Sequence, residues 1–281
     1  MNVRCRSINL SDAAALQQLG VEALAVGLFA NQEQQPLRQA VEAMLSDVER
    51  SGLQQRLSQR GFKGKAGDCL CIERLGATPA LLILVGLGEP ATFDLVALRQ
   101  ATASACKAAA PATNLGLALP VEGLPPQNAA MAMAEAARLS LYADQRFKSE
   151  SEPPRSLGSL ELLGLSEELN GSLQQAQANC SGVELARQLV AAPPNVATPQ
   201  HLADTAAGIA REFGLELKVL ERSDCEALGM GSYLAVAQGS DLPPKFIHLT
   251  YRPDGAVQRR VAMVGKGLTF DSGGYNLKVA G

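Results

Sequence analysis

Three side chains that could do chemistry lie close together in the sequence: Lys266, Asp271 and Lys278. They are spaced five and seven residues apart in the segment VAMVGKGLTFDSGGYNLK, residues 261–278. A carboxylate can bind a metal ion, and a lysine can stabilise an oxyanion or, as the neutral amine, ligate a metal. Buried lysines are rare and usually paired or functional, so two of them beside an apolar run suggest a site. The alternative from local chemistry alone is a glycine-rich turn with two solvated lysines.

Several familiar motifs do not match this segment. A phosphate-binding loop needs Ser or Thr after its lysine, but Gly267 follows Lys266. FDSGG resembles the nucleophile segment of trypsin-like serine proteases, although Phe270 stands where that segment has a glycine. Such a protease also needs a histidine base, and the sequence offers only His201 and His248. We expect His201 on a helix face and His248 at a core or edge position of a strand, neither of them as a metal ligand.

The segment VGKGLTFDSGGYNLK resembles the signature of the leucyl aminopeptidase family, also called the cytosol aminopeptidases. ARQLVAAPPNVATPQHLA (186–203) and LGMGSYLAVAQGSDLPPKFIHLTY (228–251) are similar to the same family in the same order. The resemblance covers roughly residues 180–281 strongly and the earlier part loosely. It implies a metal-dependent enzyme that releases the N-terminal residue, leucine by preference, from peptide substrates.

The resemblance also implies a role for each of the three residues. Lys266 would ligate one metal, Asp271 would bridge two metals, and Lys278 would be the catalytic lysine that polarises the scissile carbonyl. Two Mn²⁺ ions per subunit are implied, with Zn²⁺ or Mg²⁺ possible, because oxygen ligands and one amine suit all three metals. The family further implies a homohexamer.

The sequence departs from the family's pattern after Lys278. The family has a further aspartate ligand shortly after the catalytic lysine, and later an N-T-D-A-E-G-R segment; neither occurs before Gly281. We therefore expect the N-terminal portion of a longer enzyme, with part of the site lacking. We also expect the 281-residue chain alone to be inactive.

Composition excludes several other classes of protein. Hydrophobic residues make up 47% and charged residues 19% of the 281 positions, which is typical of a globular chain of one or two domains. The net charge of −3 and the lack of a basic block argue against nucleic acid as a partner. No apolar run is long enough to span a membrane and the start lacks a signal-peptide core, so we expect a cytoplasmic protein. The six cysteines include no C-x-x-C pair, which argues against a zinc–thiolate site.

Strand and helix patterns alternate along the first two-thirds of the sequence. Strands are predicted at 69–75, 80–88, 114–120 and 159–165, and helices at 35–60, 95–109 and 127–144. This β-α-β order predicts a mostly parallel sheet with helices on both faces. A polar, proline-containing loop is predicted at 148–156, inside this domain.

A second domain is predicted beyond a long helix. The sequence indicates an N-terminal α/β domain at 1–171, a linker helix at 172–192 and the start of a catalytic peptidase domain at 193–281. Thr198 is expected to cap a helix that begins with Pro199. Further strands are predicted at 213–220, 246–252 and 259–267. The predicted fold class is therefore α/β, with two domains, each a mostly parallel or mixed sheet flanked by helices, and the second one incomplete.

An alternative function comes from the first domain. The fragment Gly86-Leu-Gly88 suggests a dinucleotide-binding turn, but Pro90 follows and no acidic residue occurs from 101 to 121 to bind a ribose. A simple strand-to-helix turn is the favoured interpretation. The first domain could still be a non-catalytic small-molecule or regulatory binding module.

Overall fold

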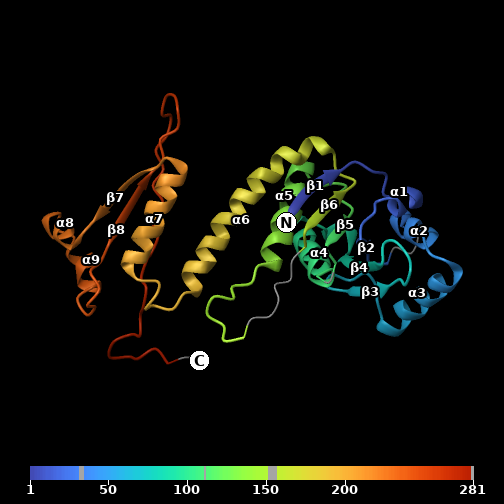
Figure 1. Ribbon diagram of the computed structural model, residues 1–281, viewed down its shortest axis with the longest axis horizontal. Coiled ribbons are helices and arrows are strands. Elements are labelled where there is room, and N and C mark those ends of the chain that lie inside the picture. The colour runs from blue at the N-terminus through green and yellow to red at the C-terminus, as the bar shows by residue number, and fades with distance from the viewer. Residues whose placement is uncertain (32–34, 111, 151–156, 280–281) are drawn as a thin grey trace. The chain divides into compact units, whose positions relative to one another are not determined.

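The computed structural model describes residues 1–31, 35–110, 112–150 and 157–279 (Figure 1). The chain divides into two compact units, Met1–Leu185 (unit 1) and Ala186–Gly281 (unit 2). Most of the predicted loop at 148–156 lies outside the described residues. No helix of the described part is long and apolar enough to cross a membrane.

Unit 1 is built on one six-stranded sheet. Its strands, in spatial order, are β1 (Asn2–Arg6), β6 (Ser159–Leu163), β5 (Asn114–Ala118), β2 (Ala23–Phe29), β4 (Leu81–Gly88) and β3 (Cys69–Glu73). The neighbours from β1 to β4 are parallel, and only the edge strand β3 runs antiparallel. The prediction of a mostly parallel sheet is confirmed, although the sequence analysis did not identify β1 or the central strand β2.

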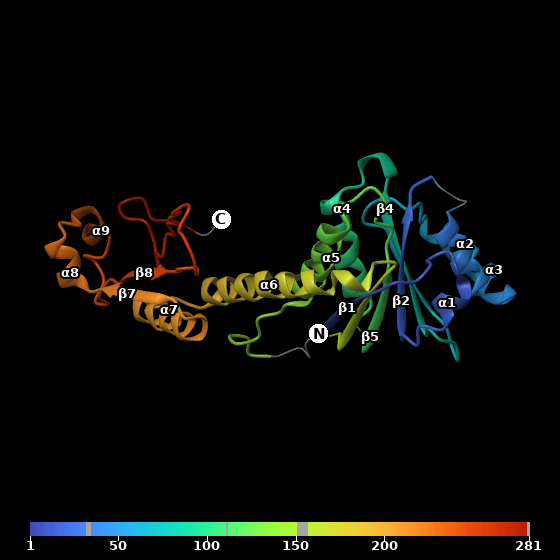
Figure 2. The same cartoon turned by 90° about the horizontal axis from the view of Figure 1, so that it is seen from above.

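Helices cover both faces of this sheet, as predicted (Figure 2). One face packs against α4 (Leu95–Ala108), α5 (Pro126–Leu141) and the first part of α6 (Asn170–Ala191). The other face packs against α1 (Ala13–Gln17), α2 (Pro36–Ala43) and α3 (Asp47–Arg60). Two short 3₁₀ turns, Pro90–Thr92 and Glu167–Leu169, precede α4 and α6. Buried alanines on α4 and α5, such as Ala105 and Ala130, let these helices lie close to the sheet.

The helix predicted at 35–60 is two helices, because a cap intervenes. Ser46 ends the first helical stretch by capping α3: its hydroxyl accepts a hydrogen bond from the Glu49 N–H, at 3.3 Å, and the Glu49 carboxylate accepts one from the Ser46 N–H, at 2.8 Å. This reciprocal arrangement satisfies N–H groups that a helix start leaves without partners. The S-x-x-E pattern in the sequence could have predicted the break.

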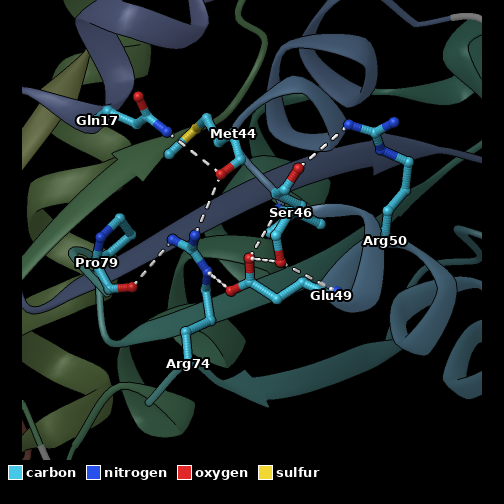
Figure 3. A network of polar contacts seen from close by, with 8 residues as sticks. Gln17, Met44, Ser46, Glu49, Arg50, Arg74 and Pro79 are labelled. Atoms are coloured by element: carbon cyan, nitrogen blue, oxygen red, sulfur yellow. Dashed lines mark hydrogen bonds and ion pairs between the residues drawn. The ribbon is translucent and has the colours of Figure 1, made fainter. Parts of the chain in front are cut away.

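A buried arginine fixes the junction between α2 and α3 (Figure 3). The Arg74 side chain is 5% exposed, and its guanidinium donates to the Glu49 carboxylate at 2.8 Å and to the Met44 and Pro79 carbonyls, each at 3.2 Å. Met44 is the C-terminal cap of α2, and Glu49 lies in the first turn of α3. One side chain therefore ties the end of α2 to the start of α3 and to the turn that follows β3.

Unit 2 contains a two-stranded antiparallel sheet, β7 (Glu216–Leu220) with β8 (Phe246–Thr250). The helices are the end of α6, then α7 (Pro199–Phe213), α8 (Arg222–Ala227) and α9 (Gly231–Val236). The predicted cap is confirmed, since the Thr198 hydroxyl accepts from the His201 N–H at 3.2 Å and Pro199 is the first helical residue. Gly214 ends α7 with a positive φ of 65°, which glycine adopts without strain.

The strand predicted at 259–267 does not form in this structure, so that prediction is wrong. Residues 251–272 contain no regular secondary structure. Val261, Met263 and Val264 are 73%, 94% and 98% exposed. A strand needs neighbouring backbone groups to pair with, and among the described residues this apolar run has none. The apolar pattern alone therefore did not determine the local structure.

Candidate functional site

The three predicted site residues all lie in the exposed segment that follows β8. Lys266 lies in its irregular part, not at a strand end as predicted. Asp271 and Lys278 flank a tight turn in which Gly273 and Leu277 form an isolated antiparallel bridge. The turn requires glycine, because Gly273 has a φ of 79° and a Cβ there would lie 2.3 Å from the Asn276 carbonyl oxygen.

Asp271 and Lys278 are in direct contact. The Lys278 ammonium donates to Oδ2 of Asp271, and the Gly273 N–H donates to Oδ1 at 2.9 Å. The hydrogen bond from Lys278 lowers the pKa of the Asp271 carboxyl, the Gly273 N–H adds to the effect, and the positive charge of Lys266 acts in the same direction. The turn therefore favours the ionised form of Asp271 and brings Asp271 and Lys278 together, whereas Lys266 lies outside the turn. The ion pair itself is not among the features that the sequence predicts.

The donors in this segment do not by themselves fit two metal ions. Each carboxylate oxygen of Asp271 already accepts a hydrogen bond, one from Lys278 and one from Gly273. The Lys266 amine is the second candidate ligand in the segment. Each cation normally binds four to six donor atoms. Within the described residues no three His, Cys, Asp or Glu side chains gather into a group that could hold a metal.

The two histidines occupy structural positions. His201 lies in the first turn of α7, where its N–H completes the Thr198 cap and its carbonyl accepts from the Thr205 hydroxyl at 2.8 Å. His248 lies on β8, opposite Lys218 of β7, with its Nε2 3.4 Å from the Thr250 hydroxyl. Both placements agree with the helix-face and strand positions predicted for them.

The Gly86-Leu-Gly88 fragment is explained by backbone packing. A Cβ at Gly86 would lie 2.0 Å from the Lys65 carbonyl oxygen, so the loop 61–68 can cross the end of β4 only above a glycine. The Gly88 N–H donates to the Gly64 carbonyl at 2.9 Å, and the Gly86 N–H donates to the Asp68 carbonyl at 2.8 Å. These contacts hold the loop against the strand, so both glycines have a structural role.

The fold and the segment 266–278 together define a class of protein. It is an α/β chain of two units in which Lys266, Asp271 and Lys278 follow the second sheet in the sequence. A model of the N-terminal domain of the cytosol aminopeptidase family matches residues 14–151, and a model of that family's catalytic domain matches residues 184–281. The chain belongs to the cytosol aminopeptidase family. The resemblance found in the sequence is therefore confirmed.

Curated relatives match almost the whole chain. A "Probable cytosol aminopeptidase" of Synechococcus sp. (strain CC9605) is 56% identical over 270 residues, which are 95% of this chain and 54% of the relative. One of the same description from Prochlorococcus marinus (strain MIT 9313) is 52% identical over 267 residues, again 95% of this chain and 54% of the relative. The chain spans about half the length of the curated relatives it matches.

Solved structures share the fold of this chain. A mutant of tomato leucine aminopeptidase matches 92% of this chain and 52% of its own, with a TM-score of 0.78 and 30% identity. The bottromycin maturation enzyme BotP, in complex with Mn, matches 83% of this chain and 46% of its own, with a TM-score of 0.65 and 26% identity. The predicted α/β fold class is thereby confirmed.

Proposed function

We propose that this chain is part of a metal-dependent aminopeptidase that releases N-terminal residues, leucine by preference, from peptides. The observation that carries the proposal is the family match over residues 184–281, which contains the turn with Asp271 and Lys278 in contact. Relatives described as cytosol aminopeptidases and the likeness to a leucine aminopeptidase structure support it. By the same reasoning the active protein works in the cytoplasm and, as the family resemblance implies, as a homohexamer.

Each residue of the turn has a chemical role in this proposal. Lys278 would stabilise, through its side-chain nitrogen, the negative oxygen that develops when the scissile carbonyl is attacked. Asp271, whose pKa its neighbours lower, would supply a carboxylate ligand to the metal centre, and Lys266 would supply a nitrogen ligand. Mn²⁺ is the metal we propose, supported by the Mn complex of BotP, with Zn²⁺ or Mg²⁺ as the chemical alternatives.

We further propose that residues 1–281 hold only part of the site. The lack of a fitting donor set around Asp271 in the described part supports this, as does the half-length match to the relatives. The remaining ligands would come from the portion of the relatives that this chain does not match. Residues 1–281 alone are therefore expected to be catalytically silent. A second candidate, a small-molecule binding role for unit 1, is supported by a cavity lined by residues of α2, α3 and loop 61–68.

A chimera tests the peptidase proposal. Residues 1–281 are joined to the unmatched portion of the Synechococcus sp. (strain CC9605) relative, and release of leucine from leucine amide is followed with excess Mn²⁺. The chimera is expected to turn over, whereas residues 1–281 alone do not. Asp271→Asn in the chimera controls for host aminopeptidases, because turnover that persists in this variant comes from a contaminant. A folded chimera without turnover, or genuine turnover by residues 1–281 alone, would contradict the proposal.

A further inference from the structure

Unit 1 contains a cavity of about 490 Å³ that the peptidase proposal does not use. It lies between α2, α3, the start of loop 61–68, the carboxyl end of β2 and Leu84 in the middle of β4. The chain leaves these neighbouring strands toward opposite faces of the sheet, since β2 leads to α2 and β4 leads to α4. Ligands of open α/β sheets bind where adjacent strands diverge in this way. The position in the fold thus favours a binding site.

Contacts hold two walls of the cavity in place, the α2–α3 pair and loop 61–68. Arg74 ties α2 to α3, and Arg50 adds hydrogen bonds to the Glu42 and Leu45 carbonyls, each at 3.2 Å. The loop is fixed by Asp68, whose carboxylate accepts from the N–H groups of Lys63 and Lys65, both at 3.0 Å. A preformed site loses little entropy when it binds a ligand.

The floor and the lip of the cavity differ in chemistry. Leu28, Val41, Leu53 and Leu84 are buried and give an apolar floor. Three charged residues line the same cavity: Arg38, Glu42 and Lys63. An apolar floor with a few converging polar groups is the usual composition of a small-molecule site.

The charged groups can accept a ligand that carries both signs. Arg38 pairs with Glu42 through Nε alone, at 3.1 Å, and the two side chains are 29% and 27% exposed. Among the described residues no partner is found for the Nη atoms of Arg38 or for the Lys63 ammonium. A carboxylate could bind these cationic groups in a charge-assisted way, while Glu42 could accept from an ammonium. Glu42 would repel a phosphate dianion, which disfavours a nucleotide.

We propose that this cavity binds a free apolar amino acid. Its carboxylate pairs with Arg38 and Lys63, its ammonium with Glu42, and its side chain rests on the apolar floor. The site uses none of the residues at 266–278, so it stands independently of the peptidase proposal. The sequence suggested a regulatory binding role for unit 1, and this proposal names the class of ligand for that role.

Calorimetry on residues 1–281 in a chelator-containing, metal-free buffer tests the inference, with leucine and phenylalanine as probes. Each is expected to bind at one site. Leucine amide, which lacks the carboxylate, and N-acetyl-leucine, which lacks the ammonium, are each expected to bind about tenfold more weakly or worse. No heat from either amino acid up to about 10 mM, or heat from a nucleotide instead, would overturn the proposal.

Substitutions test whether leucine binds in this cavity. Arg38→Gln is expected to weaken leucine binding at least about tenfold, and Arg56→Gln, at an exposed position of α3 outside the cavity, is expected to leave it unchanged. Lys63→Gln provides a second variant in a different element, in case Arg38→Gln does not fold. Leucine affinity that is the same in the folded cavity variants and in Arg56→Gln would show that the amino acid binds elsewhere.

Discussion

At the scale of single residues, Arg74 is expected to contribute strongly to the stability of unit 1. Its guanidinium is buried and bonded to one carboxylate and two backbone carbonyls. Removing it would leave the Met44 and Pro79 carbonyls without this donor and Glu49 without its charged partner. Such losses usually cost a few kcal/mol, because the two buried carbonyls regain little water, whereas the partly exposed Glu49 regains some.

Arg74→Ala is therefore expected to lower the free energy of unfolding of unit 1 by about 2–4 kcal/mol. Urea unfolding followed by far-ultraviolet circular dichroism measures this change. Arg56→Ala is the matched control, because Arg56 is exposed on α3 and is expected to change stability by less than about 0.5 kcal/mol. Equal midpoints for the two variants would show that the Arg74 network contributes no more than a surface arginine.

Glu49 makes the stability that this network gives to unit 1 depend on pH. The hydrogen bond from Arg74, followed by those from Ser46, lowers the pKa of Glu49 from its ordinary 4.5 to about 2. Because the folded pKa lies below the unfolded one, the carboxylate stabilises the fold above about pH 4.5, and this contribution is lost as the pH falls toward 2.

Glu49→Gln is accordingly expected to unfold at lower urea than the parent protein at about pH 7, with the gap narrowing toward about pH 3. Urea midpoints of both proteins across this range test the prediction. Two curves that run parallel would mean that Glu49 does not titrate as the network requires.

Some contacts of single residues could be predicted from the sequence and others could not, each for a physical reason. The Thr198 cap followed by Pro199 is local, so a short pattern predicts it. Arg74 was missed because two of its partners are backbone carbonyls, one of them 30 residues away, and no sequence pattern encodes them. The contact between Asp271 and Lys278 depends on the turn at Gly273, whose φ is set by the fold.

At the scale of elements, glycines decide how closely loop 61–68 approaches the sheet. Gly86 is buried within β4, and the Lys65 carbonyl, the Gly64 carbonyl carbon and the Asp68 Cβ lie where its side chain would be. The loop carries part of the cavity wall, so this close approach also shapes the proposed amino-acid site.

Gly86→Ala is expected to destabilise unit 1 by about 3 kcal/mol or more, because the new methyl group overlaps backbone that cannot move aside cheaply. Gly52→Ala is the control: Gly52 lies within α3 with no atom near the added methyl group, so stability should rise by up to about 1 kcal/mol. Equal stability of the two variants in urea unfolding would mean that the loop does not pack on Gly86 as described.

Most of the strands of unit 1 and both strands of unit 2 were predictable, whereas the further strand predicted at 259–267 does not form. Apolar runs such as 80–88 are buried on both faces in a parallel sheet, and their pattern reports that environment. The run at 259–267 has the same appearance but no neighbour to pair with in the described residues, so it stays irregular and exposed. The missed strand β2 shows the converse, since its run ALAVGLF mixes helix-favouring alanines with a glycine although six of its seven residues are buried.

At the scale of the whole molecule, the family match extends over both units, while the chain spans about half of its curated relatives. The turn at 271–278 was predicted to hold a metal-bridging carboxylate and a catalytic lysine, and these roles remain proposals. The structure brings Asp271 and Lys278 together and leaves the turn exposed. The account therefore depends most on whether Lys278 acts on the substrate.

The kcat of the chimera for leucine amide, measured with Lys278→Ala and with Lys218→Ala, tests this claim most directly. Lys218 is an exposed lysine on β7 and serves as the control for loss of a positive charge. The account predicts that Lys278→Ala lowers kcat by at least about 10²-fold, whereas Lys218→Ala leaves it within about twofold of the parent chimera. If the folded Lys278→Ala chimera keeps the kcat of the Lys218→Ala chimera, Lys278 does not stabilise the transition state and the proposed assignment of the turn is contradicted.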